Sequence, residues 1–369
     1  MSLPDRVLIV NPFGIGDVLF STPLIRAVRR AFPRAYLAYL CNRRTEEILC
    51  RNKNLDELFV YEKDELIALW NDRKPSAIKA AFALLWKIQR RRFDLAIDLS
   101  LGERYSFILT VLGVPRRIGF DFRHRGRFLT YRLAIDGFQN QHVVAYYRQL
   151  LEMIGINLLD AQLELEVTDE NRLAAVRRLS QLQVRDGQRI IGLAPAGGIS
   201  WGLHAYFRRW PKENFIEVGR TLSERYHATL LVFGEPRDRV VCAEIAHAIG
   251  PAAMDLSGQT TLGEFISLVA VCDLIIANDG GPLHIAVSQG VPTVSIFGPV
   301  DPVVYGPYPP TSPHWVVCKP QLPCRPCYHQ FKLPPCPYER ACLTHIEPAD
   351  VLEACEAALA KEEPVGVAA

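Results

Sequence analysis

The sequence predicts an α/β protein made of two domains, each built around a parallel sheet. Short apolar runs typical of buried strands alternate with helical patterns along the whole chain, which favours βα units. One run, Val7–Val10, ends at a glycine-containing turn that delivers Asp17 to a helix start, and another, Leu274–Ala277, ends at Asn278-Asp279-Gly280-Gly281. Open α/β sheets bind ligands outside the carboxyl ends of their strands. Two such turns, about 260 residues apart, therefore predict two facing Rossmann-like domains with a cleft between them.

The first predicted domain covers residues 1–165 and alternates strands with helices. Strands are expected at Val7–Val10, Ala35–Cys41, Glu57–Val60, Leu95–Asp98 and Arg117–Gly119. Helices are expected around Leu24–Ala31, Ala77–Arg91 and His142–Gly155. Thr22-Pro23 is either an N-cap followed by a proline in the first helical position, or a kink in a helix that begins near Asp17.

The second predicted domain covers residues 166–345, and the stretch Ile156–Val184 provides the crossing and a lead-in helix. Its strands are expected at Arg189–Ala194, Thr229–Phe233, Leu274–Ala277 and Thr293–Phe297. Its helices are expected at Lys212–Tyr226, Arg237–Ile249, Leu262–Cys272 and Pro282–Gln289. Prolines and cysteines predict an irregular segment over Pro299–Cys342. In the last segment, residues 346–369, the helix Pro348–Lys361 is expected to pack back toward the first domain.

The composition is that of an ordinary soluble globular protein, with 49% apolar and 22% charged residues. No apolar run approaches the roughly 20 residues that span a bilayer, and a strand begins too early to leave room for a signal peptide. We therefore expect a cytoplasmic protein whose membrane contact, where present, is peripheral. Its ten cysteines are accordingly not expected to form disulfides.

The charge is distributed unevenly along the chain. Residues 1–150 contain 25 Lys and Arg against 15 Asp and Glu, a net charge of +10, whereas residues 151–369 have a net charge of −8. A basic half indicates an anionic partner for the first domain. The alternative is a drift in surface composition without function.

The turn Gly14-Ile15-Gly16-Asp17 is not a dinucleotide fingerprint, because no third glycine follows three residues later. The second strand also ends at Leu40-Cys41-Asn42, without the acidic residue that binds a ribose. The glycines let the chain turn sharply and expose Asp17 at the edge of the cleft. Asp17 is either a general base toward a hydroxyl or an N-cap of the following helix.

Two further loops favour a phosphate ligand. The turn Asn278–Pro282 offers small residues and a helix N-terminus whose free N–H groups suit a phosphate, although a capped βα turn without a ligand has the same pattern. Asp279 would repel a phosphate, so it is expected to orient backbone donors or to bind a sugar hydroxyl. Ala194–Gly198 follows another strand at the same edge and leads to Arg208-Arg209, which either neutralise a diphosphate or form a solvated basic pair.

Four segments, in this order, give the chain a family resemblance. They are VNPFGIGDVLFSTPLIRAVRRAFP, FRRWPKENF, LVFGEPRD and ANDGGPLHIAVSQGVPTVSIFGPVDP. They resemble the heptosyltransferases, glycosyltransferase family 9 of bacteria, over nearly the whole chain. The resemblance implies a GT-B fold of two Rossmann-like domains.

The resemblance also implies roles for individual residues. Asp17 matches the catalytic base. The residues that match donor-binding positions, together with the adjoining small-residue loop, are Gly197, Gly198, Arg208, Glu235, Asp279, Gly280, Gly281 and His284. The residues expected on the acceptor side are Gly14, Gly16, Arg104, Arg123, Arg125 and Arg127. His284, taken alone, is more often a structural histidine.

Three features depart from the family pattern. Arg208 stands where lysine is usual, the loop Ile199–Phe207 is longer, and Asp279 is followed by Gly-Gly rather than Thr-Gly. Arginine keeps the charge but changes the hydrogen-bond geometry. The lost threonine removes one hydroxyl from the phosphate site.

A cysteine cluster poses a separate question. Cys324, Cys327, Cys336 and Cys342 have a spacing compatible with a structural zinc site, with Cys318 just upstream. The alternative is a set of buried or redox-exchanging thiols. Four thiolates would leave no open position, so a catalytic metal is not expected there, and no cofactor is expected to be required.

The resulting expectation is an inverting glycosyltransferase that moves a heptose from ADP-heptose to the lipopolysaccharide inner core, at the inner face of the cytoplasmic membrane. Its partners would be the nucleotide-sugar and an anionic, lipid-linked saccharide, and no nucleic acid. Two alternatives stay open. One is a family member with another nucleotide-sugar or glycan acceptor, and the other is a sugar-nucleotide epimerase or binding protein with the same architecture.

Overall fold

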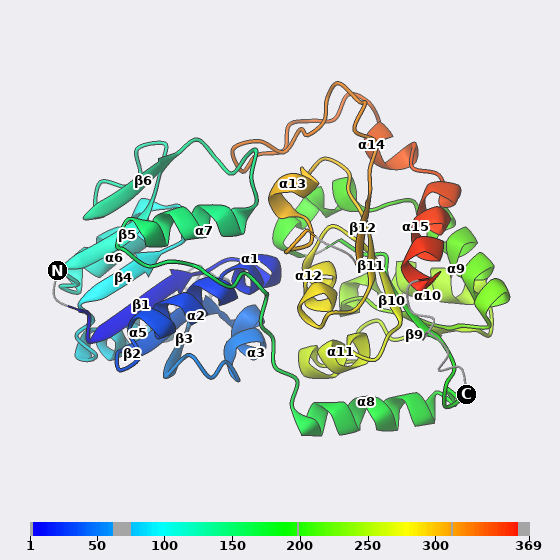
Figure 1. The fold of residues 1–369 in the computed structure, drawn as a ribbon, viewed down its shortest axis with the longest axis horizontal. Coiled ribbons are helices and arrows are strands. Elements are labelled where there is room, and N and C mark those ends of the chain that lie inside the picture. Colours follow the sequence, from blue (N-terminus) through cyan, green and yellow to red (C-terminus); the bar gives the residue numbers. More distant parts are fainter. Residues whose placement is uncertain (1–2, 62–74, 198, 311–312, 361–369) are drawn as a thin grey trace, which may run out of the picture. The chain divides into compact units, whose positions relative to one another are not determined.

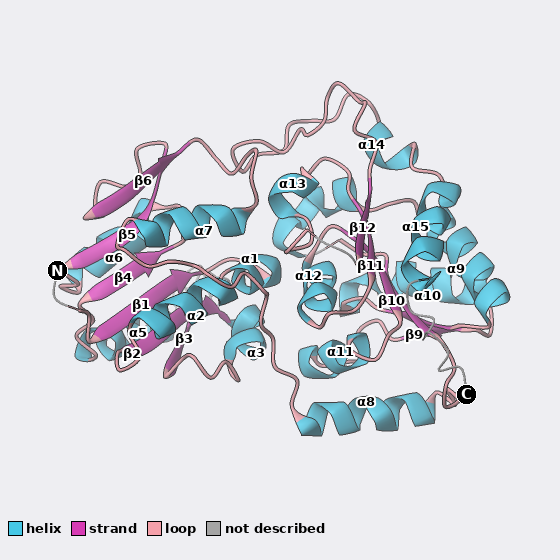
Figure 2. Ribbon diagram, in the orientation of Figure 1, coloured by secondary structure: helices cyan, strands magenta, loops and turns pink. Residues whose placement is uncertain are grey.

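The contacts of the chain divide it into two compact units, Met1–Glu166 and Val167–Ala369. The computed structural model describes residues 3–61, 75–197, 199–310 and 313–360 (Figure 1). Where the sequence analysis placed the boundary between residues 165 and 166, the contacts place it one residue later. Each unit contains one parallel sheet of six strands flanked by helices, which confirms the predicted α/β class (Figure 2).

The sheet of the first unit has the strand order β3-β2-β1-β4-β5-β6, which is the order of the Rossmann fold. Its strands are β1 (Arg6–Asn11), β2 (Tyr36–Asn42), β3 (Glu57–Tyr61), β4 (Leu95–Asp98), β5 (Arg116–Phe122) and β6 (Tyr131–Ile135). The order reverses between β1 and β4, where Val10 lies in register with Asp98. This reversal is the place where such sheets bind ligands.

Helices cover both faces of this sheet. They are α1 (Ile15–Phe20), α2 (Thr22–Ala31), α3 (Glu46–Leu49), α5 (Pro75–Arg90), α6 (Glu103–Val111) and α7 (Val143–Glu152), with a 3-10 turn, η1 (Arg43–Thr45). Side chains of α5 and α6 join one core cluster with Leu8 and Val10 of β1, so these two helices lie on the same face. Helices α2 and α7 pack against each other.

The sheet of the second unit repeats this topology, with the order β12-β11-β10-β7-β8-β9. Its strands are β7 (Ile190–Ala194), β8 (Thr229–Val232), β9 (Ala253–Asp255), β10 (Leu274–Asn278), β11 (Thr293–Ile296) and β12 (His314–Val317). Counted from β7, the strand order is again that of the Rossmann fold. Here it reverses between β7 and β10.

The helices of the second unit are α8 (Asp169–Gln181), α9 (Lys212–Tyr226), α10 (Arg239–Ile249), α11 (Leu262–Val269), α12 (Gly281–Ser288), α13 (Pro302–Tyr305), α14 (Ala341–Thr344) and α15 (Pro348–Ala360). Two 3-10 segments are η2 (Ile199–Arg208) and η3 (Pro236–Asp238). Helix α15 packs on α9 and on the strands β10 to β12, and it buries Val351 and Cys355 in the core of this unit. Its predicted return toward the first domain stays a prediction.

Three strands were not expected from the sequence, namely β6, β9 and β12. All three are edge strands. An edge strand pairs on one side only, so it can be short and half-exposed, and its apolar pattern is weak. Because β12, α13 and α14 lie within 299–344, the expectation of an irregular segment over Pro299–Cys342 was wrong in part.

The chain breaks between two helices at Ser21, which is both the C-cap of α1 and the N-cap of α2. The structure is nearest to the second predicted arrangement around Thr22-Pro23: a helix begins at Ile15, near Asp17, and breaks at Ser21, two residues before Pro23, whereas the predicted N-cap Thr22 is already the first residue of α2. Proline is compatible with the first turn of α2, because its missing N–H has no helical partner there.

Among the described residues, none of the helices has the length and apolar character needed to cross a bilayer.

Candidate active site

Asp17 lies in the first turn of α1, just beyond the carboxyl end of β1. Gly14 is the N-cap of this helix, and its N–H donates to Oδ2 of Asp17 at 3.3 Å. The side chain of Asn11 fixes the same turn by donating from Nδ2 to the carbonyl oxygen of Asp17 at 3.1 Å. The carboxylate is half-buried, so part of its surface is accessible to solvent. Asp17 is thus the third residue of α1 and not its N-cap, although its side chain accepts the N–H of the N-cap, and its role as a base stays a prediction.

Asp98 is a second carboxylate at this edge, and the sequence analysis did not select it. It ends β4, is buried, and its Oδ1 accepts the backbone N–H of Ser100 at 2.9 Å. Burial raises the pKa of Asp98 to about 6, although the hydrogen bonds from Ser100 act in the opposite direction. The sequence contained a signal for this residue, namely a carboxylate at the end of a buried strand, beside the point where the strand order reverses. Its raised pKa makes it a candidate functional group.

The four predicted acceptor-side arginines occupy two neighbouring segments of the first unit. Arg104 is exposed at the start of α6, and Arg123, Arg125 and Arg127 are exposed in the loop between β5 and β6. The two segments meet, because Arg127 forms an ion pair of 3.0 Å with Glu103. Together they form a basic surface at the carboxyl side of β4 and β5.

Arg208 and Asp279 form a buried ion pair in the second unit. Nη2 of Arg208 lies 2.6 Å from Oδ2 of Asp279, and their side chains are only 9% and 4% exposed. Burial raises the pKa of Asp279, while the Arg208 guanidinium opposes that shift by favouring the charged form. Asp279 thus holds a cation at the start of α12.

Asn278 ties three loops together at this point. Its Oδ1 accepts the N–H of Trp210 at 3.0 Å, and its Nδ2 donates to the carbonyl oxygen of Pro195 at 2.6 Å. These bonds connect the loops that follow β7, η2 and β10. Gly280 is the N-cap of α12, and a Cβ there would meet open space, with no atom nearer than 3.9 Å. The anion site predicted at this helix N-terminus stays a prediction.

The remaining donor-side residues surround the same edge. Arg209 donates to Asp238 at 2.9 Å and to the carbonyl oxygen of Gly197 at 3.3 Å, so it is held within the protein. A Cβ on Gly197 would lie 2.9 Å from the carbonyl oxygen of Ala205, so this glycine is needed for packing. Glu235 is exposed, and its Oε2 lies 3.4 Å from Nε of Arg237.

His284 is buried in α12, three residues after the first residue of that helix. Gly281 is that first residue. Gly198 lies outside the described residues. The predicted donor loops after β7 and β10 thus lie at one edge of the second sheet, while the sequence analysis missed the ion pair of Arg208 with Asp279 and the anchoring of Arg209 by Asp238.

The four cysteines of the predicted zinc site lie close together, because neighbouring thiols of this set contribute to the raised pKa of Cys327 and of Cys342. Burial, together with the thiols of Cys327, Cys336 and Cys324, raises the pKa of Cys342 to about 11. Cys336 accepts the N–H of Arg340 at 3.4 Å. Among the described residues, however, no three Cys, His, Asp or Glu side chains are placed to hold a metal ion. The side chains as placed do not fit a metal, and the zinc site stays a prediction.

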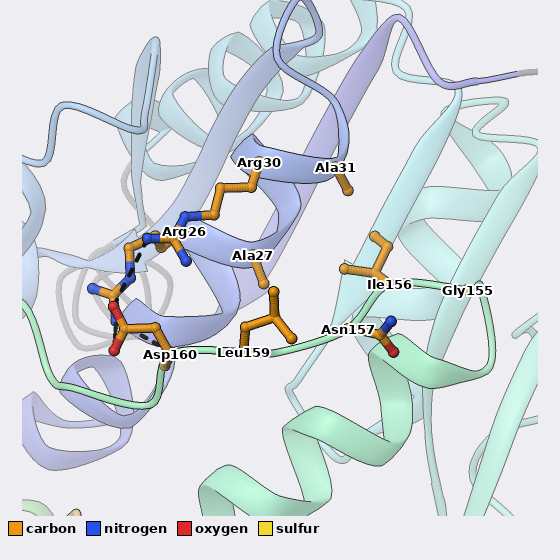
Figure 3. Close-up of a pocket in the computed structure, with 9 residues that line it drawn as sticks. All are labelled: Arg26, Ala27, Arg30, Ala31, Gly155, Ile156, Asn157, Leu159 and Asp160. Carbon is orange, nitrogen blue, oxygen red and sulfur yellow. Dashed lines mark hydrogen bonds and ion pairs between the residues drawn. The ribbon is translucent and has the colours of Figure 1, made fainter.

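A pocket of about 210 Å³ lies elsewhere in the first unit, between α2 and the segment that follows α7 (Figure 3). The carboxylate of Asp160 forms two ion pairs at the edge of this pocket. Its Oδ1 lies 3.1 Å from Nη2 of Arg26, and its Oδ2 lies 3.8 Å from Nη2 of Arg30. The helical residues that line it belong to the last turns of α2, which leads away from the edge that bears Asp17. This pocket is separate from the candidate site.

Comparison with known proteins gives one family. Residues 81–335 match the model of glycosyltransferase family 9 (heptosyltransferase). The chain is similar to lipopolysaccharide heptosyltransferase 3 of Escherichia coli, with 24% identity over 79% of this chain and 83% of that protein. It is also similar to lipooligosaccharide heptosyltransferase 2 of Campylobacter jejuni, with 25% identity over 94% of this chain and 97% of that protein.

Solved structures agree on the fold. A glycosyltransferase of family 9 from Veillonella parvula has a TM-score of 0.82 at 24% identity and covers 98% of this chain and 99% of its own. The ADP-heptose lipopolysaccharide heptosyltransferase II of Escherichia coli has a TM-score of 0.75 at 22% identity, and the match covers 97% of this chain and 100% of that chain. The GT-B class expected from the sequence is thereby confirmed.

Proposed function

The chain belongs to glycosyltransferase family 9, the heptosyltransferases, and we propose that it transfers a heptose from ADP-heptose to the inner core of lipopolysaccharide. The observation that carries this proposal is the meeting of Arg208, Asp279 and the first turn of α12. It provides a cation and a helix N-terminus at one point, which is the chemistry that a nucleoside diphosphate requires. The names of the relatives support heptose as the sugar.

On the donor side, the leaving group is ADP. The bond between the anomeric carbon and the β-phosphate oxygen breaks, and negative charge grows on that phosphate. Arg208 and the N–H groups at the start of α12 stabilise this charge. Asp279 orients Arg208 and can accept a hydrogen bond from a sugar hydroxyl, while the loop of Glu235 meets the nucleoside.

On the acceptor side, a hydroxyl oxygen attacks the anomeric carbon from the face opposite ADP, which inverts the configuration. Asp17 takes the proton of this hydroxyl as general base. The hydrogen bond from Gly14 holds the carboxylate in position. The exposed arginines Arg104, Arg123, Arg125 and Arg127 bind the phosphate groups of the inner core.

Substitution of Asp17 tests this assignment. Asp17→Asn keeps an oxygen that can accept the Gly14 N–H, so the helix cap is preserved, but it removes the basic group. We expect kcat to fall by roughly 10² to 10⁴, the usual contribution of a positioned general base. The Kd for ADP-heptose, measured by calorimetry, should remain within about twofold of wild type, since the base makes no bond to the diphosphate.

Asp17→Ala is the matched control, because it removes both the base and the cap. Its kcat should fall as far as that of Asp17→Asn, and it should in addition unfold at a lower temperature. An Asp17→Asn variant with wild-type turnover would show that Asp17 only caps α1.

A further inference from the structure

Helix α5 is apolar on two sides. Leu84 and Ile88 point inward and pack in the core of the first unit. Phe82 and Trp86, one turn apart, point outward and are 67% and 59% exposed. Two large aromatic side chains left in water on one stripe of a helix indicate a surface that is covered in use.

Helix α6 covers the same face of the sheet as α5 and also exposes apolar side chains. Its Leu109 packs in the same core cluster as Ile88, so both helices cover the same face of the sheet (Figure 1). The outward residues Phe107 and Val111 are 49% and 66% exposed. We call the four exposed residues Phe82, Trp86, Phe107 and Val111 the aromatic face.

Positive charge surrounds the aromatic face. From Lys79 to Arg92 the sequence contains five Lys and Arg and no Asp or Glu. Lys87 and Arg91 pair with Glu57, at 3.3 Å and 2.8 Å. Lys79, Arg90 and Arg92 are exposed, and the guanidinium of Arg90 lies over the ring of Trp86 at 4.5 Å. Aromatic rings beside exposed cations are typical of helices that lie in the headgroup region of a membrane.

We propose that the aromatic face docks on the surface of an anionic lipid bilayer, with Phe82 and Trp86 inserted among the headgroups. The charge favours this occupant over a protein partner, because the segment from Lys79 to Arg92, with five cations and no acid, is complementary to anionic phospholipid. Trp86 and Phe82 supply the apolar contact, and Lys79 and Arg90 bind lipid phosphate.

The inference deepens the proposed function, since a lipid-linked acceptor is presented at a membrane. The aromatic face reaches the predicted acceptor arginines, because the ring of Phe107 contacts that of Phe128 at 5.1 Å and Arg127 lies over Phe128 at 4.9 Å. An acceptor whose lipid stays in the bilayer would therefore present its phosphorylated sugars near Arg127.

Co-sedimentation of the full chain with lipid vesicles tests the proposal. Wild type should bind vesicles that contain phosphatidylglycerol and should bind vesicles of phosphatidylcholine alone much more weakly. Phe82→Ser/Trp86→Ser should lower the partition coefficient about tenfold or more, because the apolar contact is lost. Lys79→Glu/Arg90→Glu should lower it at least about fivefold for each cation removed, and added salt should have the same effect.

Leu173→Ser/Val176→Ser is the matched control, since it removes two exposed apolar side chains from α8. It should bind vesicles as wild type does. Thermal unfolding checks that every variant is folded. The docking proposal is overturned when wild type does not bind the anionic vesicles, when it binds neutral vesicles equally well, or when the α5 variants bind like the control.

A second readout separates this proposal from the proposed function. Transfer to a delipidated, water-soluble acceptor does not require a bilayer, so Phe82→Ser/Trp86→Ser should retain wild-type kcat/KM in that assay. A chain that transfers heptose but does not bind vesicles contradicts only the docking. A chain that binds vesicles but transfers nothing contradicts only the proposed function.

Discussion

The ion pair of Arg208 with Asp279 has two functions in one contact. In the folded protein the attraction between the two charges offsets the free-energy cost of removing each from water, since both side chains are at most 9% exposed. In the proposed reaction the same guanidinium neutralises the diphosphate. A single substitution at Arg208 therefore changes both the stability of the fold and the binding of the donor. A second variant that removes both charges is needed to separate the two effects.

We expect Arg208→Ala to lower the free energy of unfolding by about 3–5 kcal/mol, because it leaves the Asp279 carboxylate buried without its cation. The double variant Arg208→Gln/Asp279→Asn removes both charges and should unfold within about 1 kcal/mol of wild type. Urea unfolding measures the difference. Both variants should bind ADP-heptose at least about tenfold more weakly, by calorimetry, for loss of the charge-assisted bond.

Two results would argue against this interpretation. Wild-type stability of Arg208→Ala would mean that Asp279 does not depend on the pair. Wild-type donor affinity of the folded double variant would mean that the guanidinium does not bind the diphosphate, and Arg209 would then be the better candidate.

Asp98 predicts a pH-dependent stability. Burial raises its pKa to about 6 from an ordinary value of 3.8, so the folded protein binds this proton more tightly than the unfolded chain. The stabilising contribution of the protonated form is complete below pH 3.8 and is lost as the pH rises through about 6. At neutral pH the ionised Asp98 therefore destabilises the fold.

We expect Asp98→Asn to raise the free energy of unfolding at pH 7 by about 2 to 3 kcal/mol, since the amide keeps the acceptor for Ser100 and carries no charge. Below pH 4 the variant and wild type should be equally stable. Urea unfolding across this pH range checks both statements. A gain that persists unchanged in acid would mean that the charge of Asp98 is not its cause.

At the level of elements, the site depends on three loops that Asn278 holds together. Asn278→Ala leaves the N–H of Trp210 and the carbonyl oxygen of Pro195 buried without this partner. We expect a loss of about 1–3 kcal/mol in unfolding free energy and a raised KM for the donor, because the loop that contains Arg208 loosens.

Asn214→Ala is the control for this experiment. The Nδ2 of Asn214 donates one longer bond, 3.3 Å, to the carbonyl oxygen of Ile346, which keeps the indole N–H of Trp210 as a donor at 2.9 Å when Asn214 is replaced. It should cost less stability and leave the donor KM unchanged. Equal KM values for the two variants would contradict the role of Asn278 in positioning the donor loops.

The sequence revealed the elements unevenly, for physical reasons. Central strands such as β1 and β10 are buried along their length, so their apolar runs are continuous and their ends could be predicted. The turns after them could be predicted too, because parallel strands bring their carboxyl ends to one edge. The edge strands β6, β9 and β12 lack that signal.

The details of the site were less accessible. The contacts of Arg208 with Asp279, and of Arg209 with Asp238, join segments that are distant in the sequence, and no local pattern specifies which arginine meets which carboxylate. Asp98 did leave a local signal, as the polar end of a buried strand. The thiol cluster shows the opposite case, in which a clear spacing is present but the described side chains do not form a metal site.

For the whole molecule, the structure qualifies the charge asymmetry. Part of the basic excess of residues 1–150 is used within the first unit. Arg116 pairs with Asp94, and Arg117 donates to backbone carbonyls that include that of Phe128. Exposed basic residues lie in α5, at Arg104 and in the loop from Arg123 to Arg127, and others are spread over the unit, for example Arg34 and Arg148. The basic residues of α5, Arg104 and the loop from Arg123 to Arg127 are the ones assigned to the proposed anionic acceptor and lipid.

The most direct test is a transfer assay scored by the mass of the acceptor. The purified chain is incubated with ADP-heptose and an inner-core acceptor that lacks its terminal heptose, and the release of ADP is followed in parallel with other nucleotide-sugars as competitors. We predict that the acceptor gains the mass of one heptose, that ADP is released only when the acceptor is present, and that Asp17→Asn slows both changes by roughly 10² to 10⁴. Release of ADP or of an altered sugar without acceptor, or faster transfer from a different nucleotide-sugar, would contradict the assignment.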